Sequence, residues 1–108
     1  MEERQALLAF GALSQDTRLR ILRLLVVAGP EGVAAGMVAE QIGVTASNVS
    51  FHMKELDRAG LVTARRESRS IIYTANYDAL GGLIRFLMED CCGGRLSMCD
   101  GSAATCLD

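Results

Sequence analysis

The stretch from Met37 to Leu56, MVAEQIGVTASNVSFHMKEL, has the internal spacing of a helix-turn-helix unit. Ala39 is small enough to let two helices approach closely, and Gly43 can supply a turn with positive φ. A second helix is expected to begin near Thr45. Its apolar face contains Ala46, Val49, Met53 and Leu56, which are spaced for one side of a helix. The stretch therefore predicts two packed helices, the second of which has a side that does not belong to the core.

That other side is short, polar and able to form hydrogen bonds. It contains Ser47, Asn48, Ser50, Phe51 and Lys54. Serine and asparagine side chains can read base edges in a major groove, and a helix N-terminus can lie against a phosphate. The pattern favours a DNA-reading helix, although an ordinary two-helix corner with a Ser-rich cap would also produce it.

The composition limits the fold to one domain, because 108 residues are enough for a single core. Half of the residues are hydrophobic but only 5% are aromatic, so the core must be aliphatic, and pairing with a second copy would add stability. No run approaches the roughly 18 apolar residues of a membrane span, and the N-terminal MEERQ is unlike a secretory signal. A cytoplasmic protein is expected.

The net charge of −2 argues at first against a nucleic-acid partner, but the charges are unevenly distributed. Residues 1–75 contain nine Lys and Arg against eight Asp and Glu, whereas residues 76–108 contain two against five. The excess of acidic residues therefore lies after the helix-turn-helix region. The charge of residues 1–75 is compatible with DNA binding.

Two helices are expected before the helix-turn-helix unit. The first covers Glu2 to Leu13, and the second follows an N-cap at Ser14, carries Asp16 in its first turn and runs to Val27. The second helix is apolar around most of its circumference, so we expect it at the centre of the core. Its three arginines, expected at the surface, are Arg18, Arg20 and Arg23.

Two β-prone segments follow a helix stop at Gly60. They cover Leu61 to Arg66 and Ser70 to Thr74, and Glu67-Ser68-Arg69 separates them. A helix-turn-helix followed at once by a short hairpin describes a winged helix. The arginines near the hairpin tip, placed to reach phosphate or the minor groove, are Arg65, Arg66 and Arg69. The alternative for these side chains is an ordinary solvated loop.

A last helix is expected after Asn76, which can act as its N-cap, with Asp78 in the first turn. Its apolar stripe contains Leu80, Leu83, Ile84, Leu87 and Met88. We therefore predict a mainly α winged helix-turn-helix of five helices plus a wing, which forms a homodimer through its first and last helices. The alternative is that both helices cover only their own domain.

Over nearly its whole length the chain resembles the ArsR/SmtB family of winged-helix repressors. The segments that carry the resemblance are ALSQDTRLRILRLL (12–25), SNVSFHMKELDRAGLV (47–62) and RRESRSIIY (65–73). The resemblance implies a homodimer that occupies double-stranded operator DNA and leaves it when a metal or metalloid binds. Ser68 departs from the family pattern, because a glycine is usual at that turn and a serine there is strained.

The family pattern also places His52 on or beside the DNA-reading surface and the wing arginines on the DNA backbone. The complete predicted DNA-binding set is Thr45, Ser47, Asn48, Ser50, Phe51, His52, Lys54, Arg65, Arg66 and Arg69.

All four cysteines lie in the last 18 residues, so they cannot hold the body of the fold together. We expect a winged-helix domain over residues 1–90 and a flexible, Cys-rich, metalloid-binding tail over residues 91–108. Two sites familiar in the family are absent, because the chain has no Cys-x-Cys before the helix-turn-helix and a single histidine. In a reducing compartment the cysteines point to a metal, metalloid or redox site.

Three thiolates without an imidazole suit a soft, thiophilic centre of low coordination number. The adjacent cysteine pair with one downstream cysteine resembles that of family members that sense trivalent arsenic, and antimony. We therefore predict that As(III), with Sb(III) as a second candidate, releases the repressor from DNA by binding Cys91, Cys92 and Cys99, with Cys106 as the alternative third ligand.

Other functions fit the same sequence. They are a thiol-based redox switch, a repressor that responds to Cd, Pb or Zn, and a dimeric DNA-binding module without an effector. An enzyme is not expected, because the chain has one histidine, no phosphate-binding glycine loop and no nucleophile beside a placed base. No membrane, catalytic cofactor or further protein partner is expected.

Overall fold

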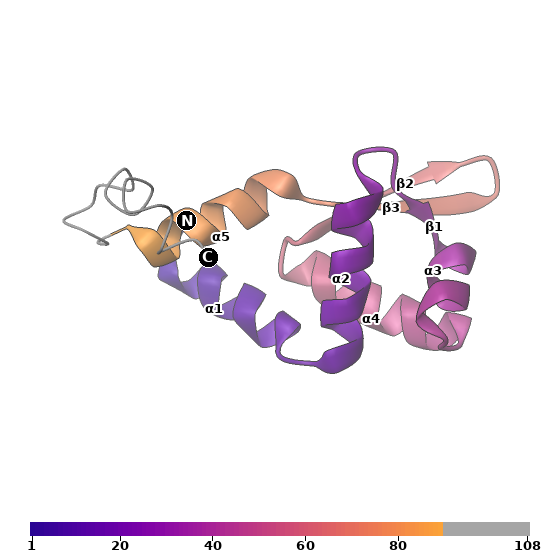
Figure 1. Cartoon of the computed structure of the whole chain (residues 1–108), viewed down its shortest axis with the longest axis horizontal. Helices are drawn as coiled ribbons and strands as arrows, with labels where there is room; N and C mark the ends of the chain where they lie inside the picture. The colour runs from indigo at the N-terminus through magenta and orange to yellow at the C-terminus, as the bar shows by residue number, and fades with distance from the viewer. Residues whose placement is uncertain (90–108) are drawn as a thin grey trace.

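The computed structural model describes residues 1–89, which form the five helices and the wing of a winged helix-turn-helix and confirm the predicted fold class (Figure 1). The helices are α1 (Glu3–Leu13), α2 (Asp16–Ala28), α3 (Ala35–Ile42), α4 (Ala46–Arg58) and α5 (Tyr77–Met88). The strands are β1 (Val33–Ala34), β2 (Val62–Glu67) and β3 (Ser70–Ala75). None of these helices is long and apolar enough to cross a membrane. The predicted tail over 91–108 lies outside the described residues.

The turn between α3 and α4 has the predicted geometry. Gly43 has φ 83° and ψ 35°, a left-handed conformation that glycine adopts without strain, and its N–H donates to the Ala39 carbonyl at 2.9 Å. Thr45 caps α4, because its side-chain oxygen accepts a hydrogen bond from the N–H of Asn48 at 3.2 Å. These two local interactions define where α3 ends and α4 begins.

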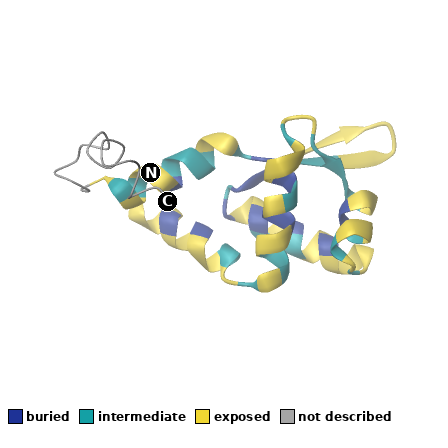
Figure 2. Cartoon of the chain, viewed as in Figure 1, coloured by how far each residue is buried: buried dark blue, intermediate teal, exposed yellow. Residues whose placement is uncertain are grey.

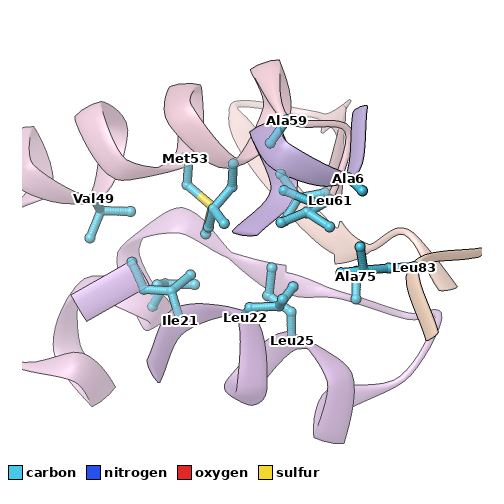
Figure 3. Close-up of a cluster of buried hydrophobic side chains, with 14 residues drawn as sticks. Ala6, Ile21, Leu22, Leu25, Val49, Met53, Ala59, Leu61, Ala75 and Leu83 are labelled. Carbon is cyan, nitrogen blue, oxygen red and sulfur yellow. The ribbon is translucent and has the colours of Figure 1, made fainter. Parts of the chain in front are cut away.

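The core lies mainly between α2 and α4 (Figure 3). The buried side chains that these two helices contribute are Ile21, Leu22, Leu25, Val49, Met53 and Leu56. The predicted apolar face of α4 is confirmed except at Ala46, which is exposed. The buried stripe begins only at Val49, so the first residue of the helix remains outside it.

Helix α2 is central but not buried on every side. Leu19 and Val26 keep 44% and 40% of their surface exposed, because the elements that pack on α2 leave its outer side uncovered. The predicted N-cap was also wrong by one residue: Gln15 caps α2 by accepting from the N–H of Arg18 at 2.8 Å. Ser14 instead ends α1, where its hydroxyl donates to the Gly11 carbonyl at 2.8 Å. Only Ser14 and Gln15 separate the two helices, so Ser14 serves the end of α1 and Gln15 the start of α2.

Strand β3 pairs with both other strands, in the antiparallel order β1-β3-β2. The sequence predicts the hairpin but not β1, because a two-residue strand has no periodicity to detect. Gly32, just before β1, has φ 82°, and a Cβ atom there would lie 2.6 Å from Cγ2 of Ile72 and 2.7 Å from the Tyr73 carbonyl oxygen. Only glycine allows this segment to lie against β3.

The hairpin turn is shorter than predicted, because Glu67 pairs with Ser70 and belongs to β2. The turn therefore consists of Ser68 and Arg69 alone. Ser68 has φ 55°, so the serine does occupy the position where a glycine is easier to accommodate.

Helices α1 and α5 converge at the end of the molecule opposite the wing (Figure 1). Asn76 caps α5 as predicted, by accepting from the N–H of Ala79 at 3.1 Å and donating to the Gly60 carbonyl at 3.0 Å. Of the predicted apolar stripe only Leu83 is buried. Helix α1 likewise buries just Ala6 and Ala9, so much of the apolar surface of both helices is left uncovered (Figure 2).

Replacing Gly32 tests the attachment of β1. The substitution Gly32→Ala combines left-handed strain with a steric clash against β3, and should lower the free energy of unfolding by about 3 kcal/mol. Gly43→Ala is the matched control, because Gly43 also has positive φ (83°) but nothing lies within 4 Å of its virtual Cβ. It should cost about 1 to 2 kcal/mol. Urea unfolding at one fixed protein concentration measures both, and equal losses would contradict the close approach.

Candidate nucleic-acid interface

The outer side of α4 presents six of the predicted DNA-binding side chains to solvent. They are Thr45, Ser47, Asn48, Ser50, Phe51 and Lys54, and all six residues are exposed. Phe51 keeps 57% of its surface exposed although it is aromatic. The first turn of α4 contains no acidic residue, so nothing there neutralises the partial positive charge of the helix N-terminus. The face can therefore offer donors, acceptors and a cation to a polyanion.

His52 lies at the edge of this face and is half-buried. Its Nδ1 is 3.2 Å from Nη1 of Arg18, and its ring contacts Phe51 edge to face with centroids 5.3 Å apart. Burial of the ring, followed by the neighbouring Arg18 cation, lowers the pKa of His52 below its ordinary value of 6.5, while Glu55 opposes the shift. Burial and the Arg18 cation both favour the neutral imidazole.

The sequence placed Arg18 at the surface, and this expectation was wrong. Arg18 is half-buried, and its Nε donates to the Ala12 carbonyl at the end of α1 at 2.7 Å. No local pattern distinguishes it from Arg20 and Arg23, because its two acceptors come from residues 12 and 52, which only the packing of α1 and α4 around α2 brings together. Arg20 and Arg23 are exposed as predicted.

The three wing arginines differ in their partners. Arg65 is exposed but bonded to other residues of the chain, since its Nε donates to Glu67 at 2.7 Å and its Nη2 donates to the Glu31 carbonyl at 2.8 Å. Arg66 and Arg69 form no ion pair with any residue in the described part of the chain. All three arginines are exposed, but only Arg65 braces β2 against the segment before β1.

Figure 1 shows the wing and the α3–α4 turn at the same end of the molecule, away from the converging ends of α1 and α5. Among residues 1–89, no group of three or more His, Cys, Asp and Glu could hold a metal ion. The predicted metalloid ligands, which are Cys91, Cys92, Cys99 and Cys106, lie outside the described residues, and their roles stay predictions.

Comparison with known proteins identifies relatives of the same architecture. Residues 13–65 match the family described as helix-turn-helix domain. YceK of Bacillus subtilis (strain 168), an uncharacterized HTH-type transcriptional regulator, is 41% identical over 61 residues, which is 56% of this chain and 60% of YceK. YgaV of Escherichia coli (strain K12), an HTH-type transcriptional regulator, is 31% identical over 88 residues, which is 82% of this chain and 87% of YgaV.

A solved structure with a similar fold is homodimeric. It is the homodimeric winged helix-turn-helix DNA-binding domain of Mb0332 from Mycobacterium bovis, a possible ArsR-family transcriptional regulator. It is 27% identical and superimposes with a TM-score of 0.64 over 83% of this chain and 89% of that domain.

The two unpaired wing arginines should carry phosphate contacts. Arg66→Ala or Arg69→Ala should each reduce the slope of log affinity against log salt by about 2 for a homodimer, one unit from each protomer. Fluorescence anisotropy with a labelled duplex, selected by the wild-type protein from a random-sequence library, measures this slope between low and moderate salt. Arg23→Ala on α2 is the charge-matched control, and an equal loss there would mean that the slope reports net charge and not contact.

Proposed function

Because this chain belongs to the family of winged helix-turn-helix transcriptional regulators, we propose that it represses transcription as a homodimer on operator DNA and is released by trivalent arsenic. The observation that carries the DNA-binding part is the exposed, hydrogen-bonding face of α4. The dimer and the effector are supported separately, by the apolar surfaces of α1 and α5 and by the cysteines that follow α5.

The geometry of α4 supports reading of a major groove. The helix is held from one side by its buried stripe, which leaves its hydroxyl, amide and ammonium groups directed outward. Such groups pair with base edges, while the cationic wing supplies sequence-independent phosphate contacts. Thr45 keeps its hydroxyl hydrogen available to a phosphate, because the capping bond from Asn48 uses only its oxygen as an acceptor.

The uncovered side chains of α1 and α5 support a homodimer. Leu7 and Leu8 of α1 are 64% and 50% exposed, and Ile84 and Leu87 of α5 are 55% and 59% exposed. Large apolar side chains gathered on two adjacent helices mark a surface that another chain covers. Since the domain of Mb0332 is homodimeric, a second copy of this chain is the proposed occupant, with both recognition helices addressing successive turns of the same duplex.

The donor chemistry of the C-terminal cysteines supports trivalent arsenic as effector. The last residue of α5 is Met88, and Cys91 follows three positions later, with Cys92 beside it. Arsenous acid condenses with three thiols by releasing three waters, so it needs neither an imidazole nor a fourth ligand. Because these cysteines follow the helix assigned to the dimer surface, ligand capture can favour a dimer that grips DNA less well, with a coupling of about 1 to 3 kcal/mol.

A charged substitution tests the dimer surface. Leu87→Glu should raise the dimer dissociation constant by about 100-fold or more, because the symmetric interface buries the new carboxylate twice. Sedimentation velocity over a concentration series measures this constant. Met37→Glu is the matched control, since Met37 is 44% exposed and belongs to α3, which lies away from the converging ends of α1 and α5 in Figure 1. A wild-type protein that stays monomeric at high concentration would contradict the proposal.

Single cysteine replacements test the effector. Under a phosphine reductant and with a chelator present, arsenite should release the wild-type protein from the selected duplex. Cys91→Ser, Cys92→Ser and Cys99→Ser should abolish that release, whereas Cys106→Ser should retain it. Anisotropy of the labelled duplex during titration with arsenite, antimonite, cadmium, lead and zinc compares the effectors. Release by peroxide alone would favour a redox switch. Release of all four variants by arsenite would contradict the proposed cysteine site, and failure of arsenite to release the wild type would remove arsenic from the proposal.

A further inference from the structure

One guanidinium connects three helices at the corner where α1 ends and α2 begins. Arg18 lies in the first turn of α2, where its N–H is fixed by the Gln15 cap. Its side chain donates from Nε to the Ala12 carbonyl at 2.7 Å, and its Nη1 lies 3.2 Å from Nδ1 of His52 on α4. Helix α4 crosses behind α2 in Figure 1, and the two are in contact. Arg18 thus bonds the recognition helix to the end of α1.

The chemistry of the two side chains decides where the proton of His52 lies. A guanidinium has only donors and stays protonated, so Nδ1 must be the acceptor of the bond from Nη1. A neutral imidazole that accepts at Nδ1 carries its hydrogen on Nε2. The charged groups that act on the ring are Arg18 from α2 and Glu55 from α4 itself.

The same corner adjoins the apolar surface assigned to the dimer. Arg18 and Glu55 line a groove between α1 and α4, and Leu7 and Leu8 form part of its α1 side. Those two leucines are among the exposed side chains that a second copy would cover. A displacement of α1 at this surface would therefore move the Ala12 carbonyl, which accepts the hydrogen bond from Arg18.

We propose that Arg18 is a positioning residue, which by donating to both the Ala12 carbonyl and Nδ1 of His52 keeps this histidine in the Nε2–H form and fixes the recognition helix relative to α1. The proposal rests on the DNA-binding function proposed above. One guanidinium cannot follow two acceptors that move apart, so a displacement of α1 from α4 breaks one of the two bonds. The orientation of α4 is thereby made to depend on that of α1.

The first test needs no DNA. The sequence contains a single histidine, so the ¹⁵N-labelled full chain gives one imidazole in long-range ¹H–¹⁵N spectra. We expect an unprotonated Nδ1 at pH 7 and a His52 pKa below 6.5. Arg18→Met should raise that pKa, because the neighbouring cation is removed while its aliphatic stem is approximated. Arg23→Met, which removes the same charge from an exposed site on the same helix, should leave it unchanged.

The second test uses the duplex selected by the wild-type protein. Arg18→Met should lower its affinity about tenfold without changing the salt slope, whereas Arg23→Met should stay within about twofold. Arg18→Lys should lose less than Arg18→Met, since an ammonium can still donate to one of the two acceptors. If Arg18→Met fails to fold, Arg18→Gln, which also removes the cation, takes its place in the comparison of pKa and affinity with the wild type.

Three results would overturn the proposal. An unmoved His52 pKa in Arg18→Met would mean that the contact does not exist in solution. A salt slope reduced by about 2 would make Arg18 a direct phosphate contact. If Arg18→Met shifts the His52 pKa but leaves the affinity for the duplex unchanged, the Arg18–His52 contact exists but does not position α4. If no duplex can be selected at all, the proposed DNA-binding function fails with it, whereas the titration still reports the Arg18–His52 contact.

Discussion

Burial of Val49, Met53 and Leu56 against α2 holds α4 from one side, and the character of the opposite face follows from this packing. Each of these side chains is at most 1% exposed and contributes about 2 kcal/mol through the area it removes from water. The capping bond at Thr45 contributes about 1 kcal/mol. The apolar stripe therefore sets the orientation of the helix, and the cap sets where it begins. Polar groups on the outer face stay free for a ligand because none is needed for packing.

The wing depends on a second set of contacts, which attach the β2–β3 hairpin to the segment before β1. Gly32 lets the segment before β1 touch β3, and Arg65 reaches from β2 to the Glu31 carbonyl in that segment. The hairpin is thus bound on the side of β1 by both backbone pairing and a side chain. The three wing arginines therefore differ in bonding although all are exposed: Arg65 braces the wing, whereas Arg66 and Arg69 form no ion pair within residues 1–89.

Helices α1 and α5 are tied to the core by few buried residues, which are Ala6, Ala9 and Leu83. Helix α1 buries two alanines and exposes two leucines, Leu7 and Leu8. A helix that packed only against its own domain would bury its large apolar side chains instead. The exposed Leu7 and Leu8 of α1 line the same groove as Arg18. A partner that covers α1 would consequently be connected to α4 through the Ala12 carbonyl, Arg18 and His52.

The sequence by itself determined the helix-turn-helix spacing, the wing, the start of α4 near Thr45, the cap at Asn76 and the polar face of α4, because periodicity, glycine turns and caps are properties of neighbouring residues. It also located the cysteines but not their geometry. Tertiary structure alone decided that β1 pairs with β3, that Arg65 donates to the Glu31 carbonyl and that Arg18 bonds Ala12 and His52. The Arg18–Ala12 bond spans six residues between two helices. The other interactions join residues far apart in the chain, so only packing brings their partners together.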